Sequence, residues 1–576
     1  MISDYKKKEI TTVIKNIIGL MGIVCLASIP LMIHGIESGS TDLFFHLWRI
    51  EAIKENLQMG VFPVKMYGSY MQGKGYAAGV FYPDLFLYLP ALLRILGVTI
   101  VRAYKILLIV MNAMTAIIAY RVAKYILNHD GKALLIAFVW TTCNYRMEDV
   151  YNRAALGESL ALTFYPLLIG AIFILAYEIG RDYQRRSICW LVIGASGVIE
   201  SHILSTEMII IFLILMCLFN LKYILKREKI HVIFISALST LFLNAGFLVP
   251  FLQYMITEKV SVVSNGIQQI QMQGLKLKNI LPYVDTEITV LDGSISTTQP
   301  KTLGYSLLAI GCICVITVLG RKNKDYTDKQ IRLLVLDLVG TFMASRYFPY
   351  DFLCAHIGVF NKLLGTIQFP WRWLGCASAV LVFSFIWFLY KEKNHTLSVK
   401  NVVIGIVLLS CVISVTSKSY EVIMYAKQNN AISYFEKTSE LPQESIYQIM
   451  GGEYLPVKAR VNGQMFSMNE YNEPDVMRGW KKVDDEYRLI VDVKEEQDIS
   501  VPIWYYSGYR AWDIQGNDLE VKCGDDGYLQ IKLTASYTGE IVIQYVEPWY
   551  WRVAELLSLI TVILYSMHCF CVFSEQ

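Results

Sequence analysis

The stretch LALTFYPLLIGAIFILAY, residues 160–177, carries no charged side chain. About 20 mostly apolar residues in a helix cross the hydrocarbon core of a bilayer, so this stretch predicts a transmembrane helix. Similar apolar runs occupy residues 17–33, 106–120, 208–219 and 377–389. The chain is therefore predicted to cross a membrane many times.

The composition also indicates a membrane protein. Of 576 residues, 55% are hydrophobic and only 18% are charged, and the mean hydropathy is +0.41. A water-soluble surface could hardly accommodate this balance. The net charge of +3 is small and the basic residues are dispersed, so no nucleic-acid partner is indicated. Most of the 12 cysteines lie in apolar runs, and neither a disulfide framework nor a metal-binding motif is readable.

Basic residues recur in every second connection between the apolar runs, for example at Lys6 before the first run and at Arg185. The positive-inside rule places these connections, and the N-terminus, in the cytoplasm. Residues 81–96 are apolar too, but a span there would invert the sidedness of everything after it, so an interfacial or re-entrant helix is predicted. About twelve spans are expected, near residues 11–34, 101–126, 133–147, 158–179, 188–204, 207–225, 230–255, 303–320, 331–346, 368–390, 400–417 and 550–573.

The last long outer segment has the pattern of a water-exposed domain. In residues 487–493, 528–533 and 540–545, apolar and polar side chains alternate, as in strands with one buried face. The sequence thus predicts an α-helical polytopic membrane protein with a C-terminal extracytoplasmic β-sandwich before the last helix. Its expected parts are a transmembrane domain, 1–417, which includes the first outer loop, 35–100; a mainly β domain, 418–549; and a C-terminal transmembrane helix, 550–576.

The first outer loop contains the segment SGSTDLFFHLWRIE, residues 38–51. On a helix, Asp42, His46 and Arg49 share one face, and together they could deprotonate a hydroxyl and hold a phosphate. The alternative is an interfacial helix, capped by Ser40 or Thr41, with solvated polar residues. Its opposite face, expected in the lipid headgroup layer, comprises Phe44, Leu47, Trp48 and Ile50.

Residues 60–84 of the same loop are rich in Gly, Tyr and Pro and include Tyr82. Such a composition predicts a shaped loop whose glycines let the backbone approach a ligand. Ordinary interfacial turns with membrane-belt tyrosines are an equally good interpretation.

Further charged residues lie at the predicted outer mouths of spans. Arg153 and Glu158 flank the start of one span, and Arg372 stands between two tryptophans before another. Charges beside hydrocarbon are costly unless they are paired or face a polar cavity, so Arg153 and Glu158 are functional-site candidates, with a structural Arg–Glu pair as the alternative. Arg372 suits phosphate binding by a bidentate guanidinium, with interfacial anchoring as the alternative. His202, between two short spans, is either a proton carrier or a satisfied packing residue.

Several of these segments together resemble the GT-C superfamily of polytopic glycosyltransferases. The closer resemblance is to bacterial membrane proteins described as YfhO-like or as related to 6-pyruvoyl-tetrahydropterin synthase. The segments that carry it are DLFFHLWR (42–49), GVFP (60–63), FYP (81–83), YNRAALGE (151–158), QFPWR (368–372), GEYLP (452–456) and YYSGYR (505–510).

The resemblance implies a multi-pass enzyme of a bacterial plasma membrane whose active face is extracytoplasmic. It implies an inverting glycosyltransferase with Asp42 as general base, a polyprenyl-phosphate-linked sugar as donor and a cell-envelope glycan or polymer as acceptor. His46, Arg49, Tyr82, Arg153, Glu158, His202 and Arg372 would bind substrate. Asp42 is followed by Leu43, so the Asp-Glu pair of protein mannosyltransferases is missing, and whether a divalent metal ion is a cofactor stays open.

Two other functions fit the same segments. One is a transporter or flippase for a lipid-linked glycan, which requires charges deep inside the spans. The other is a non-catalytic scaffold for envelope assembly that binds partners through the β domain. Five aromatic residues of that domain could stack on sugars or form its core instead; they are Trp504, Tyr505, Tyr506, Tyr509 and Trp512.

Overall fold

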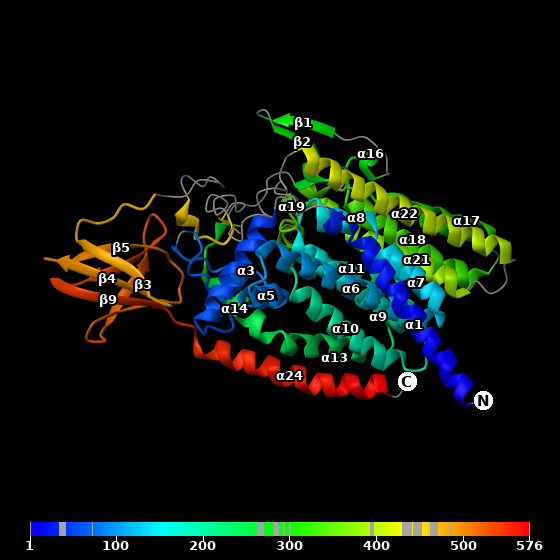
Figure 1. The fold of residues 1–576 in the computed structure, drawn as a ribbon, viewed down its shortest axis with the longest axis horizontal. Coiled ribbons are helices and arrows are strands. Elements are labelled where there is room, and N and C mark those ends of the chain that lie inside the picture. The colour runs from blue at the N-terminus through cyan, green and yellow to red at the C-terminus, as the bar shows by residue number, and fades with distance from the viewer. Residues whose placement is uncertain are drawn as a thin grey trace.

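The protein consists of a helical body and a β-rich domain that projects from one end of it (Figure 1). In this computed structural model, α1 (Ile2–Ala27) begins and α24 (Trp549–Ser574) ends at the opposite end of the body. The chain termini and the β-rich domain thus lie at opposite ends, as the predicted topology requires. The structure describes residues 2–33, 42–71, 73–261, 270–280, 287–291, 294–298, 301–321, 323–391, 397–428, 441, 452–460, 470–483 and 485–574.

The helical body is built from helices of unequal length. The longer ones are α1, α6 (Ile100–Leu127), α7 (Asp130–Thr141), α9 (Leu156–Tyr177), α10 (Tyr183–Ile199), α11 (Ile203–Phe219), α13 (Arg227–Leu243), α14 (Ala245–Thr257), α17 (Gly304–Gly320), α18 (Lys324–Met343), α21 (Trp373–Lys391), α22 (Leu397–Gln428) and α24. Short helices join them: α2 (Ile29–Ile33), α8 (Asn144–Tyr151), α12 (Leu221–Ile224), η2 (Ile270–Gln273), α16 (Leu277–Ile280), α19 (Tyr350–His356), α20 (Gly358–Leu364) and η3 (Pro370–Arg372).

Every predicted span overlaps a helix, but twelve spans are not confirmed. Among the described residues, six helices are long and apolar enough to cross a membrane, or seven if α13 and α14, bent by 79°, form one span. The remaining helices fall short because α7 has 12 residues, α10, α11 and α17 have 17 residues each, and charged residues interrupt α18. Hydropathy locates apolar segments but does not fix the length of a continuous helix. The molecule is a multi-pass membrane protein by the length and composition of these helices.

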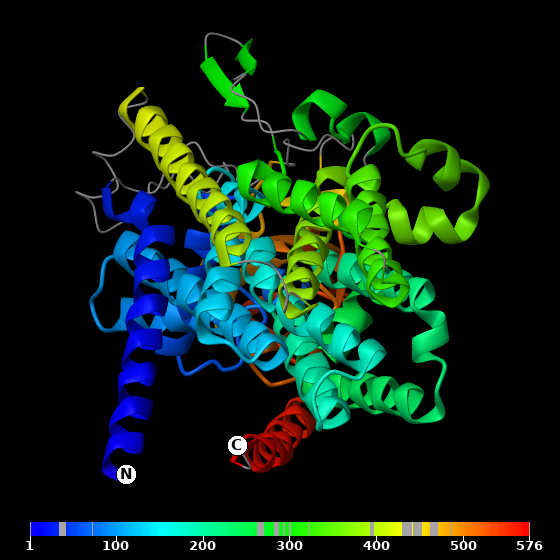
Figure 2. The same ribbon diagram turned by 90° about the vertical axis from the view of Figure 1, so that its right-hand side faces the viewer.

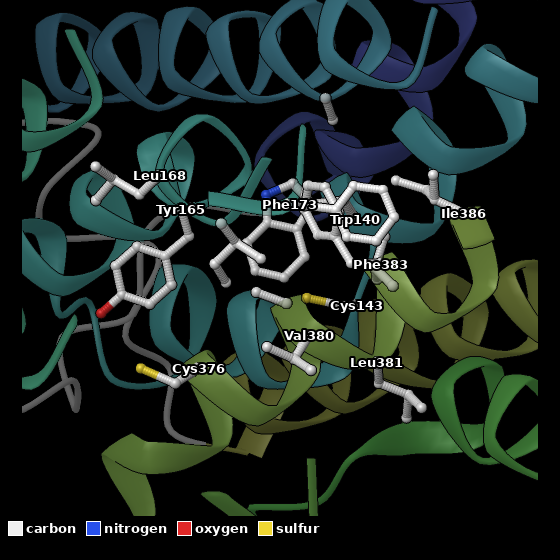
Figure 3. Close-up of a cluster of buried hydrophobic side chains, with 14 of the residues drawn as sticks. Trp140, Cys143, Tyr165, Leu168, Phe173, Cys376, Val380, Leu381, Phe383 and Ile386 are labelled. Atoms are coloured by element: carbon white, nitrogen blue, oxygen red, sulfur yellow. The ribbon is translucent and has the colours of Figure 1, made fainter. Parts of the chain in front are cut away.

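α9, the helix of the decisive apolar stretch, lies at the centre of the body. It is apolar nearly all round, and its residues 156–176 are all buried inside the protein. Phe173 of α9 packs against Phe383 of α21 with ring centroids 5.5 Å apart, and Trp140 of α7 lies beside them (Figure 3). In contrast, only 11% of the apolar window of α1 and of α24 is buried. Both helices lie at the edge of the body (Figure 2), where their apolar side chains would face lipid.

The first outer segment forms α3 (Leu43–Gln58), α4 (Ala78–Phe81), η1 (Leu85–Leu87) and α5 (Tyr88–Ile95). Residues 81–96 therefore contain only short helices and no complete span, in agreement with the prediction. The expectation for the apolar face of α3 is wrong, however. Phe44, Leu47 and Ile50 are buried in protein, not in the headgroup layer, and Trp48 is half-buried. The helix packs mainly on α5, with further contacts to α6, and the ring of Trp48 meets that of Tyr70; the helical pattern could not reveal these partners.

The β-rich domain is one antiparallel sheet of seven strands in the order β3-β4-β9-β6-β7-β8-β5. The predicted sandwich of two sheets is not confirmed. The alternating pattern in the sequence shows that each strand buries one face, but it does not show how many sheets share the core. The strands are β3 (Met477–Val483), β4 (Glu486–Val493), β5 (Gln497–Trp504), β6 (Tyr509–Asp513), β7 (Asp518–Cys523), β8 (Tyr528–Leu533) and β9 (Tyr537–Tyr545); η6 (Val457–Ala459) precedes them, and β1 (Glu287–Leu291) pairs with β2 (Ser294–Thr298) elsewhere.

The first outer segment and the sheet share one apolar core. The Tyr487 hydroxyl donates to the carbonyls of Gly68, at 3.1 Å, and Gly73, at 3.2 Å. A Cβ on Gly75 would lie 2.9 Å from the hydroxyl oxygen of Tyr509, and one on Gly68 would lie 2.5 Å from Nζ of Lys482. These glycines therefore let the β-rich domain, rather than a ligand, approach the backbone of the loop.

The aromatic residues of both regions are mostly interior. Tyr67, Tyr70 and Tyr76 are buried, so the interpretation of loop tyrosines as a membrane belt is wrong. In the sheet, Trp504 and Tyr506 are also buried. Tyr509 joins them in the core, whereas Tyr505 and Trp512 are half-buried. The core interpretation therefore holds for three of the five aromatic residues in question.

Candidate active site at the junction of α3, α8 and α9

Asp42 lies at the N-terminus of α3, directly against the corner between α8 and α9. Its backbone N–H donates to the carbonyl of Arg153, at 3.4 Å, and its carbonyl accepts from the N–H of His46, at 3.3 Å. Asp42 itself occupies the N-cap position of α3, and the predicted caps Ser40 and Thr41 lie outside the described residues. Positions 42 and 153, far apart in the sequence, thus belong to the same end of the helical body.

Arg153 and Arg372 meet at a single buried carboxylate. Oε2 of Glu158 lies 3.1 Å from Nη1 of Arg153 and 3.3 Å from Nε of Arg372. Arg153 also pairs with Asp149, one turn earlier on α8. The structural Arg–Glu pair considered for Arg153 and Glu158 is therefore present, and it is extended by a second guanidinium. Two guanidinium groups thus face two carboxylates, and each guanidinium carries five N–H donors, more than one carboxylate can take up.

A residue in the left-handed backbone region lies close in sequence to each of these arginines. Ala154, after Arg153, has φ +51°, and Gln368, before η3, has φ +61°. Gln368 also accepts from Nη1 of Arg372, at 3.4 Å. Left-handed conformations at residues other than glycine cost free energy, and they concentrate where a fold must aim particular side chains. Here the two turns aim the arginines at Glu158 from the starts of α9 and α21.

A second buried cluster surrounds Arg49. Its Nη2 lies 2.6 Å from Oδ1 of Asp84 and 2.6 Å from the carbonyl oxygen of Pro83, and its Nη1 lies 3.2 Å from Nδ1 of His46. The interpretation of α3 as a helix with solvated polar residues is therefore wrong. Arg49 and His46 have exposed fractions of only 1% and 2%, because residues 78–88 fold over them.

Tyr82 connects the two clusters. Its ring lies 4.2 Å below the guanidinium carbon of Arg49, with the rings of His46 and His202 at 6.0 and 5.7 Å. Its hydroxyl approaches Gly157, the residue before Glu158, so closely that a Cβ there would clash. Tyr82 thus links the first outer segment to the start of α9 and to the α10–α11 turn.

Both histidines turn Nδ1 toward an N–H donor, Arg49 for His46 and the backbone of Ser205 for His202. Burial, followed by the positive charge of Arg49, lowers the pKa of His46 well below its usual range, so this imidazole is neutral. His202 is the N-cap of α11, where its Nδ1 accepts from the N–H of Ser205, at 3.2 Å. The packing interpretation of His202 therefore has a structural basis.

Glu453 is a site residue that the sequence reasoning did not single out. The N–H of its neighbour Tyr454 donates to the hydroxyl of Tyr76, at 3.2 Å, and the ring of Tyr454 stacks on Phe81 with centroids 5.2 Å apart. Glu453 is thereby held close enough for its charge to interact with Asp42. Burial and the Asp42 carboxylate raise its pKa to about 7. Glu453 belongs to the segment GEYLP, which is one of the segments that carry the family resemblance. Helical or strand periodicity does not connect this segment with residue 42.

No metal centre is evident at this junction. In the described part of the chain, no three His, Cys, Asp or Glu side chains are grouped so that they could hold a metal ion. The carboxylates of Asp84, Asp149 and Glu158 instead pair with arginines. The described residues therefore do not fit a bound divalent cation, and no step of the chemistry below passes through one.

Comparison with known proteins yields only distant likenesses. No protein-family model and no curated protein matches the sequence. Among solved structures, the cryo-EM structure of the arabinofuranosyltransferase AftD from Mycobacteria has a TM-score of 0.34 and 14% identity, covering 70% of this chain and 26% of that one. The crystal structure of the Archaeoglobus fulgidus oligosaccharyltransferase in the apo form has a TM-score of 0.34 and 10% identity, covering 78% of this chain and 61% of that one. Likeness at this level carries no argument about fold or function.

Proposed function

We propose that the protein is an inverting membrane glycosyltransferase that transfers a sugar from a polyprenyl-phosphate-linked donor to an extracytoplasmic glycan or polymer. The observation that carries this proposal is the position of Asp42 against Arg153, beside a buried cluster in which two arginines share Glu158. A carboxylate and a guanidinium pair at one place supply the two functions that the reaction needs, a base and a phosphate binder.

The location of the arginines suits a lipid-linked donor. Arg153 precedes α9 and Arg372 precedes α21, two helices long enough to span the bilayer. A polyprenyl phosphate keeps its chain in the hydrocarbon and its phosphate at the boundary, which is where the ends of these helices would lie. His46, Arg49, Tyr82 and His202 support the junction and complete its polar wall.

The chemistry requires one proton transfer and one displacement. Asp42 accepts the proton of an acceptor hydroxyl, and the oxygen attacks the anomeric carbon of the donor. The bond between that carbon and the phosphate oxygen breaks, and the lipid phosphate leaves with the electron pair and is stabilised by Arg153 and Arg372. A single displacement inverts the anomeric centre, and general-base assistance is typically worth 10²–10⁴-fold in rate.

Replacement of Asp42 by Asn tests the proposal, because it removes the base and preserves the shape. The full chain in proteoliposomes is supplied with polyprenyl-phosphate-linked hexoses and N-acetylhexosamines, and the sugar transferred to envelope polymer is measured. We expect Asp42→Asn to lower transfer at least about 100-fold. Asp525→Asn, at a fully exposed aspartate of the sheet, is the matched control and keeps full activity. Unimpaired transfer by Asp42→Asn would exclude Asp42 as base.

A transporter has less support from the positions of the buried charges. Asp84, Asp149, Arg153 and Glu158 all lie in loops or at helix ends, whereas Asp337 is a buried acid within α18. A translocation pathway needs polar groups through the depth of the membrane. Ion pairs among the described residues instead lie near helix ends, for example Arg153 with Glu158 at one end of α9 and Lys229 with Glu178 at the other.

A further inference from the structure

A cavity of about 420 Å³ lies between the first outer segment, the β-rich domain and the start of α24. Its walls include Asn56 at the end of α3, Gly60 and Lys65 from the following loop, and Tyr487 and Gln544 from neighbouring strands. Its volume is within the range of pockets that bind small molecules. It is therefore large enough for part of an oligosaccharide.

The cavity is distinct from the junction at Asp42. Asn56 lies 14 residues beyond Asp42 (56 − 42) along α3, which corresponds to about 21 Å at a rise of 1.5 Å per residue. A ligand in the cavity would therefore not touch Asp42. A chain-like molecule that ran along α3 could occupy both places.

The charges around the cavity balance one another. Arg552 lies 3.0 Å from Glu547 and 2.8 Å from Glu555, and Lys65 lies 3.9 Å from Glu555. Lys482, on the sheet side, faces the negative charges of Glu55 and Asp485. The basic groups of the wall are thus matched by carboxylates, so the wall has no large excess of positive charge. A phosphate or an anionic lipid headgroup is the competing ligand, which the experiment below distinguishes from a neutral one.

The uncharged groups of the wall suit sugar hydroxyls and sugar rings. Gln544 and Asn56 contribute amides, each with two N–H donors and an acceptor oxygen. One donor of each is used within the protein, because Nδ2 of Asn56 donates to the carbonyl of Ala52 and Nε2 of Gln544 donates to Asp485. Tyr487, Tyr509 and Tyr545 contribute ring surface, and the hydroxyls of Tyr487 and Tyr545 are bonded to Gly68 and Tyr254. A ligand with many hydroxyls, apolar ring faces and no net charge matches this combination.

We propose that this cavity binds a neutral oligosaccharide segment of the acceptor, remote from the sugar that is transferred. This deepens the proposed function, on which it rests, by assigning the acceptor a second contact on the protein. If the acceptor glycan is bound at a distance from its reacting end, its successive sugar units stay near Asp42, because a tethered group has a raised local concentration.

The test is a binding measurement on the full chain in lipid nanodiscs, with maltohexaose, cellohexaose and chitohexaose as probes. Met59→Trp places a large side chain in the cavity wall, and Gln58→Trp, at the exposed neighbouring position outside the cavity, is the matched control. We expect at least one probe to bind the unmodified protein and Gln58→Trp equally, and Met59→Trp at least about tenfold more weakly. Gln544→Leu, which removes one amide and keeps the fold of the sheet, is expected to weaken the same probe several-fold.

Three results would overturn the assignment. The first is that none of the three probes binds. The second is that a probe binds Met59→Trp and Gln58→Trp equally. The third is that Met59→Trp weakens binding only to vesicles of anionic lipid. The Asp42→Asn variant separates this proposal from the proposed function, because it should bind the probe normally while it fails to transfer sugar. Normal transfer by Asp42→Asn together with lost binding in Met59→Trp would reject the catalytic role and leave the binding site standing.

Discussion

Single side chains at the junction of α3, α8 and α9 hold each other by charge. Glu158 is the common partner of Arg153 and Arg372, so its removal leaves two guanidinium groups facing each other in a buried place. Loss of one partner from a buried ion pair typically costs about 3–5 kcal/mol. We therefore expect Glu158→Gln to lower the melting temperature of the purified protein markedly. Glu207→Gln, at a glutamate that accepts a hydrogen bond from the Thr366 hydroxyl, should change the melting temperature little.

Glu453 makes the stability of the protein depend on pH. Its pKa is raised to about 7 in the folded chain, from an ordinary value of 4.5, so the folded state binds its proton more tightly than the unfolded state. Its contribution to stability is complete below pH 4.5 and is lost as the pH rises through 7. Glu453→Gln should thus melt like the unmodified protein at pH 4.5 and at a higher temperature at pH 8.5. Glu470→Gln, at an exposed position, should melt like the unmodified protein at both pH values. If the difference in melting temperature between Glu453→Gln and the unmodified protein were the same at every pH, the raised pKa of Glu453 would be contradicted.

At the scale of the elements, the start of α9 depends on a close approach. A Cβ on Gly157 would clash with the Tyr82 hydroxyl and lie 2.9 Å from the carbonyl oxygen of Ser201. The tyrosine can rotate away, but the backbone carbonyl cannot, so we expect Gly157→Ala to destabilise the protein by about 1–3 kcal/mol and to lower transfer. Gly405→Ala, in α22 where a Cβ meets nothing within 4 Å, should be neutral or slightly stabilising. Partial recovery in Gly157→Ala combined with Tyr82→Phe would identify the hydroxyl as one source of the strain.

The sequence predicted elements better than it predicted their surroundings. The apolar run at 160–177 lies in a central buried helix, and the strands at 487–493 and 528–533 are present as expected. These predictions succeed because hydrophobic periodicity is a local property. The apolar face of α3 was assigned to lipid headgroups, since periodicity shows that a face is buried but not whether lipid or protein buries it.

The candidate site could be predicted only in part for the same reason. Asp42, His46 and Arg49 are related by helical spacing, and the structure brings them to one region. Asp84 and Glu453, however, reach that region through the path of the loop and of the β-rich domain. No pattern in one sequence connects residue 453 with residue 42, so such partners become visible only in three dimensions.

At the scale of the whole molecule, the proposed function requires the β-rich domain and the turn after α9 to face opposite sides of the membrane. Figure 1 shows the domain at one end of the body, and the N-terminal end of α1 and the C-terminal end of α24 at the other. Single cysteines test this in a variant whose natural cysteines are replaced. A membrane-impermeant maleimide should label Asp525→Cys on intact cells, and should label Arg181→Cys, in the exposed turn between α9 and α10, only after permeabilisation.

The basic residues around position 181 make the expected direction definite, because the positive-inside rule retains such turns in the cytoplasm. Both cysteines should react fully in detergent, which controls for burial. If Arg181→Cys reacted on intact cells and Asp525→Cys did not, the whole molecule would be inverted, and Asp42 would face the cytoplasm. An acceptor outside the cell could then not reach it, whatever the geometry of the arginines.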